Sequence, residues 1–482
     1  MVNSIDRRKR WLALYVLCLG VLMIVLDTTI VNVALPSIRQ DLGFTETSLV
    51  WVVNAYMLTF GGFLLLGGRL GDLYGHRKLF LLGLTLFTIA SLACGLANSQ
   101  ALLIVARAVQ GLGGAVVSAV ALSLIMNLFT EPSERAKAMG IYGFVCAGGG
   151  SIGVLLGGVL TSALSWHRIF LVNLPIGVAV YALCLLLLPD GRGQANASRL
   201  DIAGAATVTS SLMLAVYAIV NGNEAGWTSA QSIGLLGSAA VLMAIFLAIE
   251  ARVRAPLMPL GLFRLRNVAT ANVVGVLWAA SMFAWFFISA LYMQLVLGYS
   301  ALRVGLGFLP ANLIMAAFSL GISAKLVMRF GLRLPLAAAG LALFARAPVG
   351  GNFVIDVLPG MILLGLGAGI AFNPVLLAAM SDVKPEEAGL ASGVVNTSFM
   401  MGGALGLAVL ASLAAARANS LLSSGTDSVI ALNGGYHLAF LIGGVFAAAA
   451  AVIGATFLRA GRQSAAHEGE EASRQAGSPA AH

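Results

Sequence analysis

Two residues of opposite charge lie deep inside long apolar stretches of this sequence, and they are the first candidates for chemistry. Of the 19 acidic residues, only Asp27 lies well inside such a stretch, and Arg107 is the only basic residue equally deep. An ionisable group at the centre of a bilayer costs about 2.5–3.5 kcal/mol on insertion scales, so its presence needs a reason. A carboxyl group there could take up and release a proton beside a fixed positive charge. The alternative is a static buried ion pair that only fixes helix packing.

The two charged groups can lie at a similar depth. Asp27 precedes Pro36, near the outer end of the first apolar stretch, by a helical rise of about 13 Å. Arg107 follows Ala101, near the outer start of the fourth apolar stretch, by a rise of about 9 Å. We therefore predict that the carboxyl group and the guanidinium group meet if their two helices are neighbours.

The composition excludes a soluble globular protein. Charged residues make up 10% of the 482 residues, hydrophobic residues make up 59%, and the mean hydropathy is +0.95, whereas a soluble chain averages about 25% charged residues. Most of the surface must therefore face lipid. The net charge of +9 lies in small clusters between apolar runs, which suits an anionic membrane surface and excludes a nucleic-acid partner.

Membrane-spanning helices need about 20 mostly apolar residues, and on that criterion we predict about fourteen spans. They lie at 11–35, 47–67, 79–97, 101–126, 137–162, 169–188, 201–220, 229–249, 268–293, 303–324, 333–350, 357–380, 388–415 and 436–458. The eleventh span is weak, because Arg346 and Pro348 crowd its outer end, and we expect it to be short and bent.

The distribution of the 28 Lys and Arg residues gives the orientation. With the N-terminus inside, most of them fall in the tails and in the cytoplasmic loops, as the positive-inside rule requires. The exceptions are Arg39, Arg168, Arg303, Arg346 and Arg417 in outer loops, and Arg107 within a span. We predict a multi-pass protein of the inner (plasma) membrane with both termini in the cytoplasm.

A short polar segment rich in glycine, from Gly68 to Lys78, follows the second span. Its glycines permit a tight turn, and they place Asp72 near a helix end, where an acid can pair with a basic side chain across a cytoplasmic interface. The pattern closely resembles the signature loop of the major facilitator superfamily. That resemblance implies a cytoplasmic gate formed by Gly68, Asp72, Gly75 and Arg77.

Two further motifs continue the resemblance. The residues that match the superfamily's fourth-helix motif are Leu103, Arg107, Gln110, Gly111, Gly113 and Gly114. The residues that resemble the fifth-helix motif of proton-coupled exporters are Gly149, Gly153, Gly157 and Gly158. The first three recur at every fourth residue, so they share one helix face and let another helix approach closely. Val154 stands where that motif has proline, which removes a kink and leaves glycine-faced packing alone as an alternative.

Three stretches point to one branch of that superfamily. Residues 26–36 resemble the first-helix signature of the fourteen-span drug:proton antiporters, the EmrB/QacA type. Residues 166–177 resemble the start of that branch's sixth helix, although Arg168 stands where an aromatic residue is usual, and residues 292–310 resemble its connection between helices nine and ten. The resemblance extends, with the motifs above, along the whole helical part of the chain.

The resemblance implies an all-α integral membrane protein with the major facilitator fold. Two six-helix bundles and two inserted helices would make 14 transmembrane helices. The ranges expected are 1–190 for the N-terminal six-helix bundle, 191–255 for the two inserted linker helices, 256–460 for the C-terminal six-helix bundle and 461–482 for a disordered cytoplasmic tail. The second half keeps Gly331 and Arg333 of the signature loop but has Met328 in place of its acid, so the gate should depend on the first loop.

The function implied is a proton-coupled secondary transporter that exports hydrophobic or amphipathic small molecules, drugs or toxic metabolites, by alternating access. Asp27 would accept the proton beside Arg107, and the proton gradient would supply the energy without a cofactor. Substrate-cavity candidates, chosen as polar or aromatic residues within spans, are Asn54, Tyr56, Trp285, Asn312 and Asn396. The expected partners are the small-molecule substrate, protons and the lipid bilayer; the sequence does not tell whether a periplasmic adaptor protein takes part.

Two alternatives stay open. One is a nutrient or metabolite importer or facilitator on the same fold, and the other is a non-transporting membrane receptor or scaffold. An enzyme is disfavoured, because the histidines lack the spacing of metal ligands and no metal site is expected. A Gly-x-x-x-x-Gly-Lys-Ser/Thr phosphate-binding loop is missing from the sequence, so this chain is not expected to use ATP.

Overall fold

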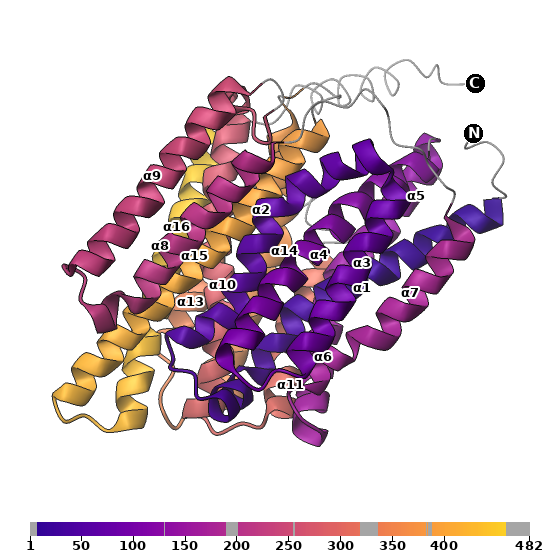
Figure 1. Cartoon of the computed structure of the whole chain (residues 1–482). Coiled ribbons are helices and arrows are strands. Elements are labelled where there is room, and N and C mark those ends of the chain that lie inside the picture. Colours follow the sequence, from indigo (N-terminus) through magenta and orange to yellow (C-terminus); the bar gives the residue numbers. More distant parts are fainter. Residues whose placement is uncertain are drawn as a thin grey trace, which may run out of the picture.

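The computed structural model is a bundle of helices that stand side by side (Figure 1). It describes residues 7–129, 131–188, 201–253, 256–318, 336–381, 383 and 388–458, without the side chains of some of them, Asp72 included. No strand occurs in these ranges. The predicted tail at 461–482 and the second-half motif at 328–333 lie outside them.

The first half of the chain forms seven helical segments, and two further helices follow it. Their bounds are α1 (Arg7–Leu42), α2 (Trp51–Tyr74, after a short 3₁₀ turn at Ser48–Val50), α3 (His76–Gly95), α4 (Gln100–Leu128), α5 (Pro132–Ala163), α6 (Arg168–Leu171), α7 (Asn173–Leu187), α8 (Ile202–Ala225) and α9 (Ala230–Arg252). The sixth predicted span is split into α6 and α7. Pro175 has no N–H to donate to the carbonyl of Leu171, where α6 ends, so the first helix cannot run on unbroken.

The second half contains the remaining helices. Their bounds are α10 (Arg266–Leu291), which continues in a π-turn (Tyr292–Val296), α11 (Ala301–Ala317), α13 (Leu336–Phe344), α14 (Leu358–Ser381, after a π-turn at Phe353–Val357), α15 (Ala388–Ser423) and α16 (Ser428–Phe457). Serine or aspartate side chains cap several helices; Ser99, for example, accepts the N–H of Leu102 at the start of α4, as expected of an N-cap residue.

Each predicted span contains a described helix. Twelve of the described helices are long and apolar enough to cross a membrane. The two shorter ones, α11 and α13, border residues 319–335, which lie outside the described part. In the eleventh span α13 ends at Phe344, two residues before Arg346, and its beginning borders residues outside the described part. The all-helical membrane fold is thus confirmed.

Helix contacts fall into two groups. In the first half α1 packs against α5 and α7, and α4 packs against α2 and α3; in the second half α10 packs against α15 and α16, and α11 and α13 pack against α14. The halves meet where α2 packs against α15 and where α5 packs against α11. α8 contacts both α2 and α15, and α9 packs on α8, so the inserted helices lie along the junction of the halves (Figure 1).

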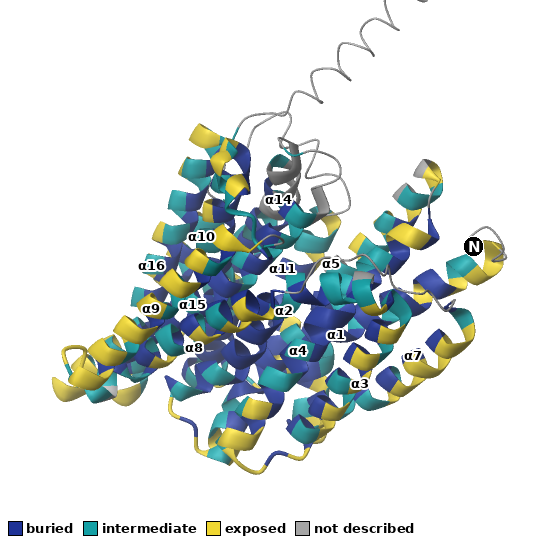
Figure 2. Ribbon diagram, turned by 45° about the horizontal axis from the view of Figure 1, so that its top comes forward, coloured by how far each residue is buried: buried dark blue, intermediate teal, exposed yellow. Residues whose placement is uncertain are grey.

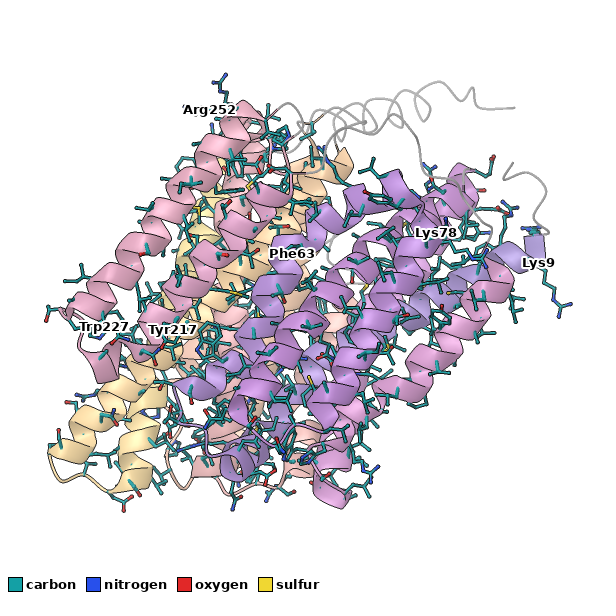
Figure 3. The ribbon with its side chains drawn as sticks, in the orientation of Figure 1. Lys9, Phe63, Lys78, Tyr217, Trp227 and Arg252 are labelled. Atoms are coloured by element: carbon teal, nitrogen blue, oxygen red, sulfur yellow. The ribbon has the colours of Figure 1, made fainter. Side chains whose placement is uncertain are left out.

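The outside of the bundle is apolar. Large side chains such as Leu82 and Ile89 of α3 and Leu186 of α7 are more than half exposed, and exposed residues follow the outward faces of α7 and α9 (Figure 2). Such a surface is stable in lipid and not in water. Lys9, Lys78 and Arg252 lie toward one side of the bundle and Trp227 toward the other (Figure 3).

Candidate functional site

The structure brings Asp27 and Arg107 together in the interior of the first half. Asp27 of α1 is 0% exposed and Arg107 of α4 is 1% exposed, and Arg107 Nη1 donates a hydrogen bond to Asp27 Oδ2. The depth argument from the sequence therefore predicted the geometry of the pair. Burial removes water from both charges, so each depends on the other and on nearby dipoles.

Three uncharged polar residues complete the surroundings of the carboxyl group. Asp27 Oδ1 accepts hydrogen bonds from Gln110 Nε2 at 2.7 Å and from Asn173 Nδ2 at 3.0 Å. Ser91 Oγ accepts from the same two amides at 3.1 and 2.9 Å, and it donates to the carbonyl of Phe170 at 2.9 Å. Helices α1, α3, α4 and α7 are thus joined by one polar network around Asp27.

Arg107 has further partners that do not depend on the carboxyl group. Its Nε donates to the carbonyl of Val52 at 2.8 Å, and its Nη1 donates to Gln110 Oε1 at 2.8 Å. The guanidinium carbon lies 4.4 Å from the ring centroid of Tyr56 and 5.7 Å from that of Phe170, within the range of cation–π attraction. The guanidinium group of Arg107 thus has backbone, amide and aromatic partners besides the carboxyl group of Asp27.

The predicted glycine face of α5 packs against the helix that carries Asp27. A Cβ atom added at Gly149 would lie 2.9 Å from Val25, one at Gly153 would lie 2.9 Å from the carbonyl oxygen of Leu26, and one at Gly157 would lie 2.6 Å from that of Ile30. Only glycine permits such a close approach of two backbones. α5 therefore touches α1 directly on both sides of Asp27.

The fourth glycine of that motif faces the other half of the protein. A Cβ atom at Gly158 would lie 2.8 Å from the carbonyl oxygen of Ala301 at the start of α11, and one at Gly305 would lie 2.9 Å from that of Val154. Val154, in place of the family's proline, is fully buried at this contact. α5 thus links α1, which carries the acid, to α11 in the second half.

The signature segment is tighter than the sequence indicated. α2 runs to Tyr74 and α3 begins at His76, so only Gly75, with φ of 94°, separates them. Gly68 lies inside α2, where an added Cβ would meet Ala119 at an ordinary 3.8 Å. Asp72 lies in the last turn of α2, and its side chain lies outside the described part. Arg77 Nη2 donates to the carbonyl of Leu185 in α7 at 2.9 Å.

The predicted cavity residues do not form one group. Tyr56 belongs to the surroundings of Arg107. Asn54 Nδ2 donates to the carbonyl of Ala404 at 2.9 Å and so joins α2 to α15, whereas Asn396 Nδ2 donates to its own helix. Trp285 and Asn312 are each 1% exposed, and neither Trp285 Nε1 nor Asn312 Nδ2 has a hydrogen-bond partner among the described residues.

Two members of the network, Ser91 and Asn173, were missed at the sequence level. Each is one polar residue in an apolar span, and its distance from Asp27 along the chain gives no sign of contact. Asn173 lies within the stretch that resembles the branch's sixth helix, which was the available sign of its importance.

A partly buried ion pair lies outside the spans, between Arg39 at the end of α1 and Glu46, whose oxygen is 3.1 Å from Arg39 Nη1. Burial raises the pKa of Glu46, and the neighbouring Arg39 opposes this shift. A raised native pKa stabilises the fold at low pH, and this contribution is lost as the pH rises through the native pKa. We expect Glu46→Gln to raise the Tm at neutral pH and to leave it unchanged below the usual carboxyl pKa of 4.5. A lower Tm at neutral pH would show that the attraction to Arg39 outweighs desolvation.

A lipid-facing bundle of long helices around a desolvated acid–base pair is the architecture of an integral membrane protein. Residues 17–407 match the family model of the Major Facilitator Superfamily. The chain belongs to this superfamily of transporters.

Proteins named for drug resistance or drug export resemble the chain over most of its length. It is 39% identical to the puromycin resistance protein pur8 of Streptomyces alboniger over 90% of this chain and 89% of that one. It is 42% identical to the cephamycin export protein CmcT of Amycolatopsis lactamdurans over 83% and 84%. It is 37% identical to the multidrug resistance protein Stp of Mycobacterium tuberculosis over 85% and 76%.

Solved transporter structures share the fold. A bacterial homolog of the human lysosomal transporter Spinster, in an inward-facing and unoccupied conformation, aligns with a TM-score of 0.62 at 16% identity, over 95% of this chain and 100% of that one. An auto-inhibited peptide transporter of the POT family aligns with a TM-score of 0.63 at 14% identity, over 93% and 96%. These likenesses confirm the architecture.

Proposed function

We propose that the protein exports hydrophobic or amphipathic small molecules, drugs or toxic metabolites, from the cytoplasm in exchange for protons. The observation that carries the proposal is the buried carboxyl group of Asp27, held by Arg107, Gln110 and Asn173. The proposal is supported by the names of the relatives, which refer to resistance against puromycin, export of cephamycin and multidrug resistance. The protein would lie in the plasma membrane with both termini in the cytoplasm.

The network offers a way to couple a proton to helix movement. When Asp27 takes up a proton, its negative charge disappears and Arg107 keeps only its carbonyl, amide and aromatic partners. The loss of attraction changes the packing of α1 against α4. Because α5 touches α1 through Gly153 and α11 through Gly158, a shift of α1 reaches the interface between the halves.

Hydrogen bonds join the two halves at the side assigned to the outside, as expected when the transporter is closed to the outside. Gln294 Nε2 donates to the carbonyl of Val33 at 3.0 Å, and the N–H of Leu302 donates to Ser162 Oγ at 3.0 Å. All four residues lie near the ends of their helices that the charge distribution assigns to the outside. Val33 lies on α1, six residues after Asp27, so protonation from outside and opening of this contact involve the same helix.

Transport in vesicles tests the proposal. Purified protein in proteoliposomes should move a fluorescent amphipathic cation against its gradient when a pH gradient is imposed, and a proton uncoupler should abolish this movement. Substrate and proton each shift the same equilibrium between two conformations, which couples their movements. In an exporter that exchanges substrate for protons, the two fluxes run in opposite directions. Parallel fluxes would establish the importer, and the absence of flux with a panel of substrates would favour a receptor or scaffold.

The signature segment gives a separate prediction for exchange rate. We expect Asp72→Asn to slow substrate exchange severalfold without removing substrate binding, because Asp72 lies at the cytoplasmic end of α2 and not in the network around Asp27. Counterflow rates and equilibrium binding of the same substrate separate the two effects. Unchanged turnover would exclude a gating role for this acid.

A further inference from the structure

A second pair of buried acidic side chains lies apart from the network around Asp27. Asp201 precedes the first residue of α8, and Glu250 lies in the last turn of α9. The two residues are 5% and 3% exposed, although both stand at helix ends, where acidic side chains are ordinarily solvated. α8 and α9 pack against each other, which brings the two ends together.

One oxygen of each carboxyl group has a clear backbone partner. Asp201 Oδ1 accepts the N–H of Gly204 at 2.7 Å and so caps α8, and Glu250 Oε2 accepts the N–H of Met258 at 3.1 Å. The other two oxygens, Asp201 Oδ2 and Glu250 Oε1, are buried and have no hydrogen-bond donor among the described residues. A Cβ atom added at Gly204 would lie 2.5 Å from the first and 3.0 Å from the second, so both face the same small space.

This arrangement is unfavourable if both groups are ionised. A carboxylate oxygen can only accept hydrogen bonds, so two of them facing each other in a buried space repel and remain unsatisfied. A single proton turns one of the two into a donor and satisfies both atoms at once. The two side chains are close enough for such a hydrogen bond.

The charges around the pair also favour one proton. Arg69 of α2 is close enough to interact with Glu250, and its Nη2 donates to the carbonyl of Pro256 at 3.0 Å. Among the described residues, this one guanidinium group can balance one carboxylate, and a proton on the second carboxyl group would leave these three side chains without net charge. Asp72 lies one turn beyond Arg69, with its side chain outside the described part, and Arg252 is exposed.

We propose that Asp201 and Glu250 form a second proton-binding site, in which the two carboxyl groups share one proton at the cytoplasmic ends of the inserted helices. The site holds the segment that leads into the second half, since Glu250 binds the N–H of Met258 and Arg69 binds the carbonyl of Pro256. Loss of the proton would set two like charges against each other and weaken this connection. The connection between the inserted helices and α10 is thus sensitive to cytoplasmic pH.

Infrared difference spectra between the unaltered protein and its variants, recorded at neutral pH, test for the shared proton. The carbonyl stretch of a protonated carboxylic acid should be present in the unaltered protein and lost in both Glu250→Gln and Asp201→Asn, because an amide N–H then takes the place of the proton. The band should persist in Glu131→Gln, which alters an exposed acid, and in Asp27→Asn, which alters the transport network. Spectra of Glu250→Gln and Asp201→Asn that keep the whole band would overturn the proposal.

Thermal unfolding across pH provides a second readout, which needs only the unaltered protein and Glu250→Gln. At alkaline pH, where the shared proton is lost, the Tm of the unaltered protein should fall relative to that of Glu250→Gln. Mg²⁺ or Ca²⁺ should shift neither Tm. Stabilisation of the unaltered protein alone by either ion would identify a cation site and contradict the shared proton. Neither readout measures transport, so failure here is distinguishable from failure of the proposed export cycle.

Discussion

Asp27→Asn should reduce transport driven by a pH gradient to the level that remains with an uncoupler. Asparagine has the shape of aspartate and keeps an oxygen that can accept from Arg107, but it cannot take up or release a proton. The variant should therefore insert and unfold much like the unaltered protein, while its transport no longer responds to the pH gradient. Uptake of a fluorescent substrate by proteoliposomes, at matched protein content, measures the loss.

A matched control removes an acid that lies outside the network. Glu131→Gln alters an exposed side chain that caps no helix, and it should transport at the unaltered rate. Counterflow, which requires no net proton movement, should survive at least in part in Asp27→Asn. Full pH-driven transport by that variant would remove Asp27 from the mechanism, although the helical fold would be unaffected.

Arg107→Met should cause the largest loss of stability. The change leaves the carboxyl group of Asp27 buried without its opposite charge, and removing one partner of a buried ion pair typically costs about 3–5 kcal/mol. It also removes the hydrogen bond to the carbonyl of Val52 and the contact with the ring of Tyr56. The free energy of unfolding in mixed micelles measures the effect, and Arg417→Met, at an exposed position of α15, should have little effect.

The double variant Asp27→Asn/Arg107→Met separates charge from packing. Removing the acid together with the base abolishes the uncompensated charge, so much of the lost stability should return, while pH-driven transport should remain absent. The two residues are in direct contact, so the two effects should be strongly non-additive. Additive losses would mean that Arg107 stabilises the fold through its packing and not through Asp27.

Much of the fold was predictable because membrane helices satisfy their own backbone hydrogen bonds and are recognisable as long apolar stretches of sequence. The positions of the spans and the meeting of Asp27 with Arg107 follow from apolar length, charge distribution and helical rise. The break between α6 and α7 was missed. Pro175 lies in a continuous apolar run, and the sequence does not show whether a proline there lies within one helix or follows the end of a preceding helix.

The candidate site was predictable only in part. Gln110 was expected through its motif, but Ser91 and Asn173 are uncharged, and nothing local distinguishes them from polar residues that pack between helices. The burial of Asp201 and Glu250 was not predictable, because both stand at helix ends, where acidic side chains are ordinarily solvated. Burial at a helix end depends on which neighbour covers it, and here that neighbour is the opposite end of a helix hairpin together with α2.

The sequence by itself determined that this chain spans the membrane many times and that Asp27 needs a partner, because an apolar solvent tolerates neither free backbone groups nor single charges. Only the tertiary structure decided which side chains share the space around Asp27, which helix each glycine of α5 approaches, and that two further carboxyl oxygens face each other. These are contacts between residues far apart in the chain, and their energies depend on how helices are rotated against one another, which hydropathy does not specify.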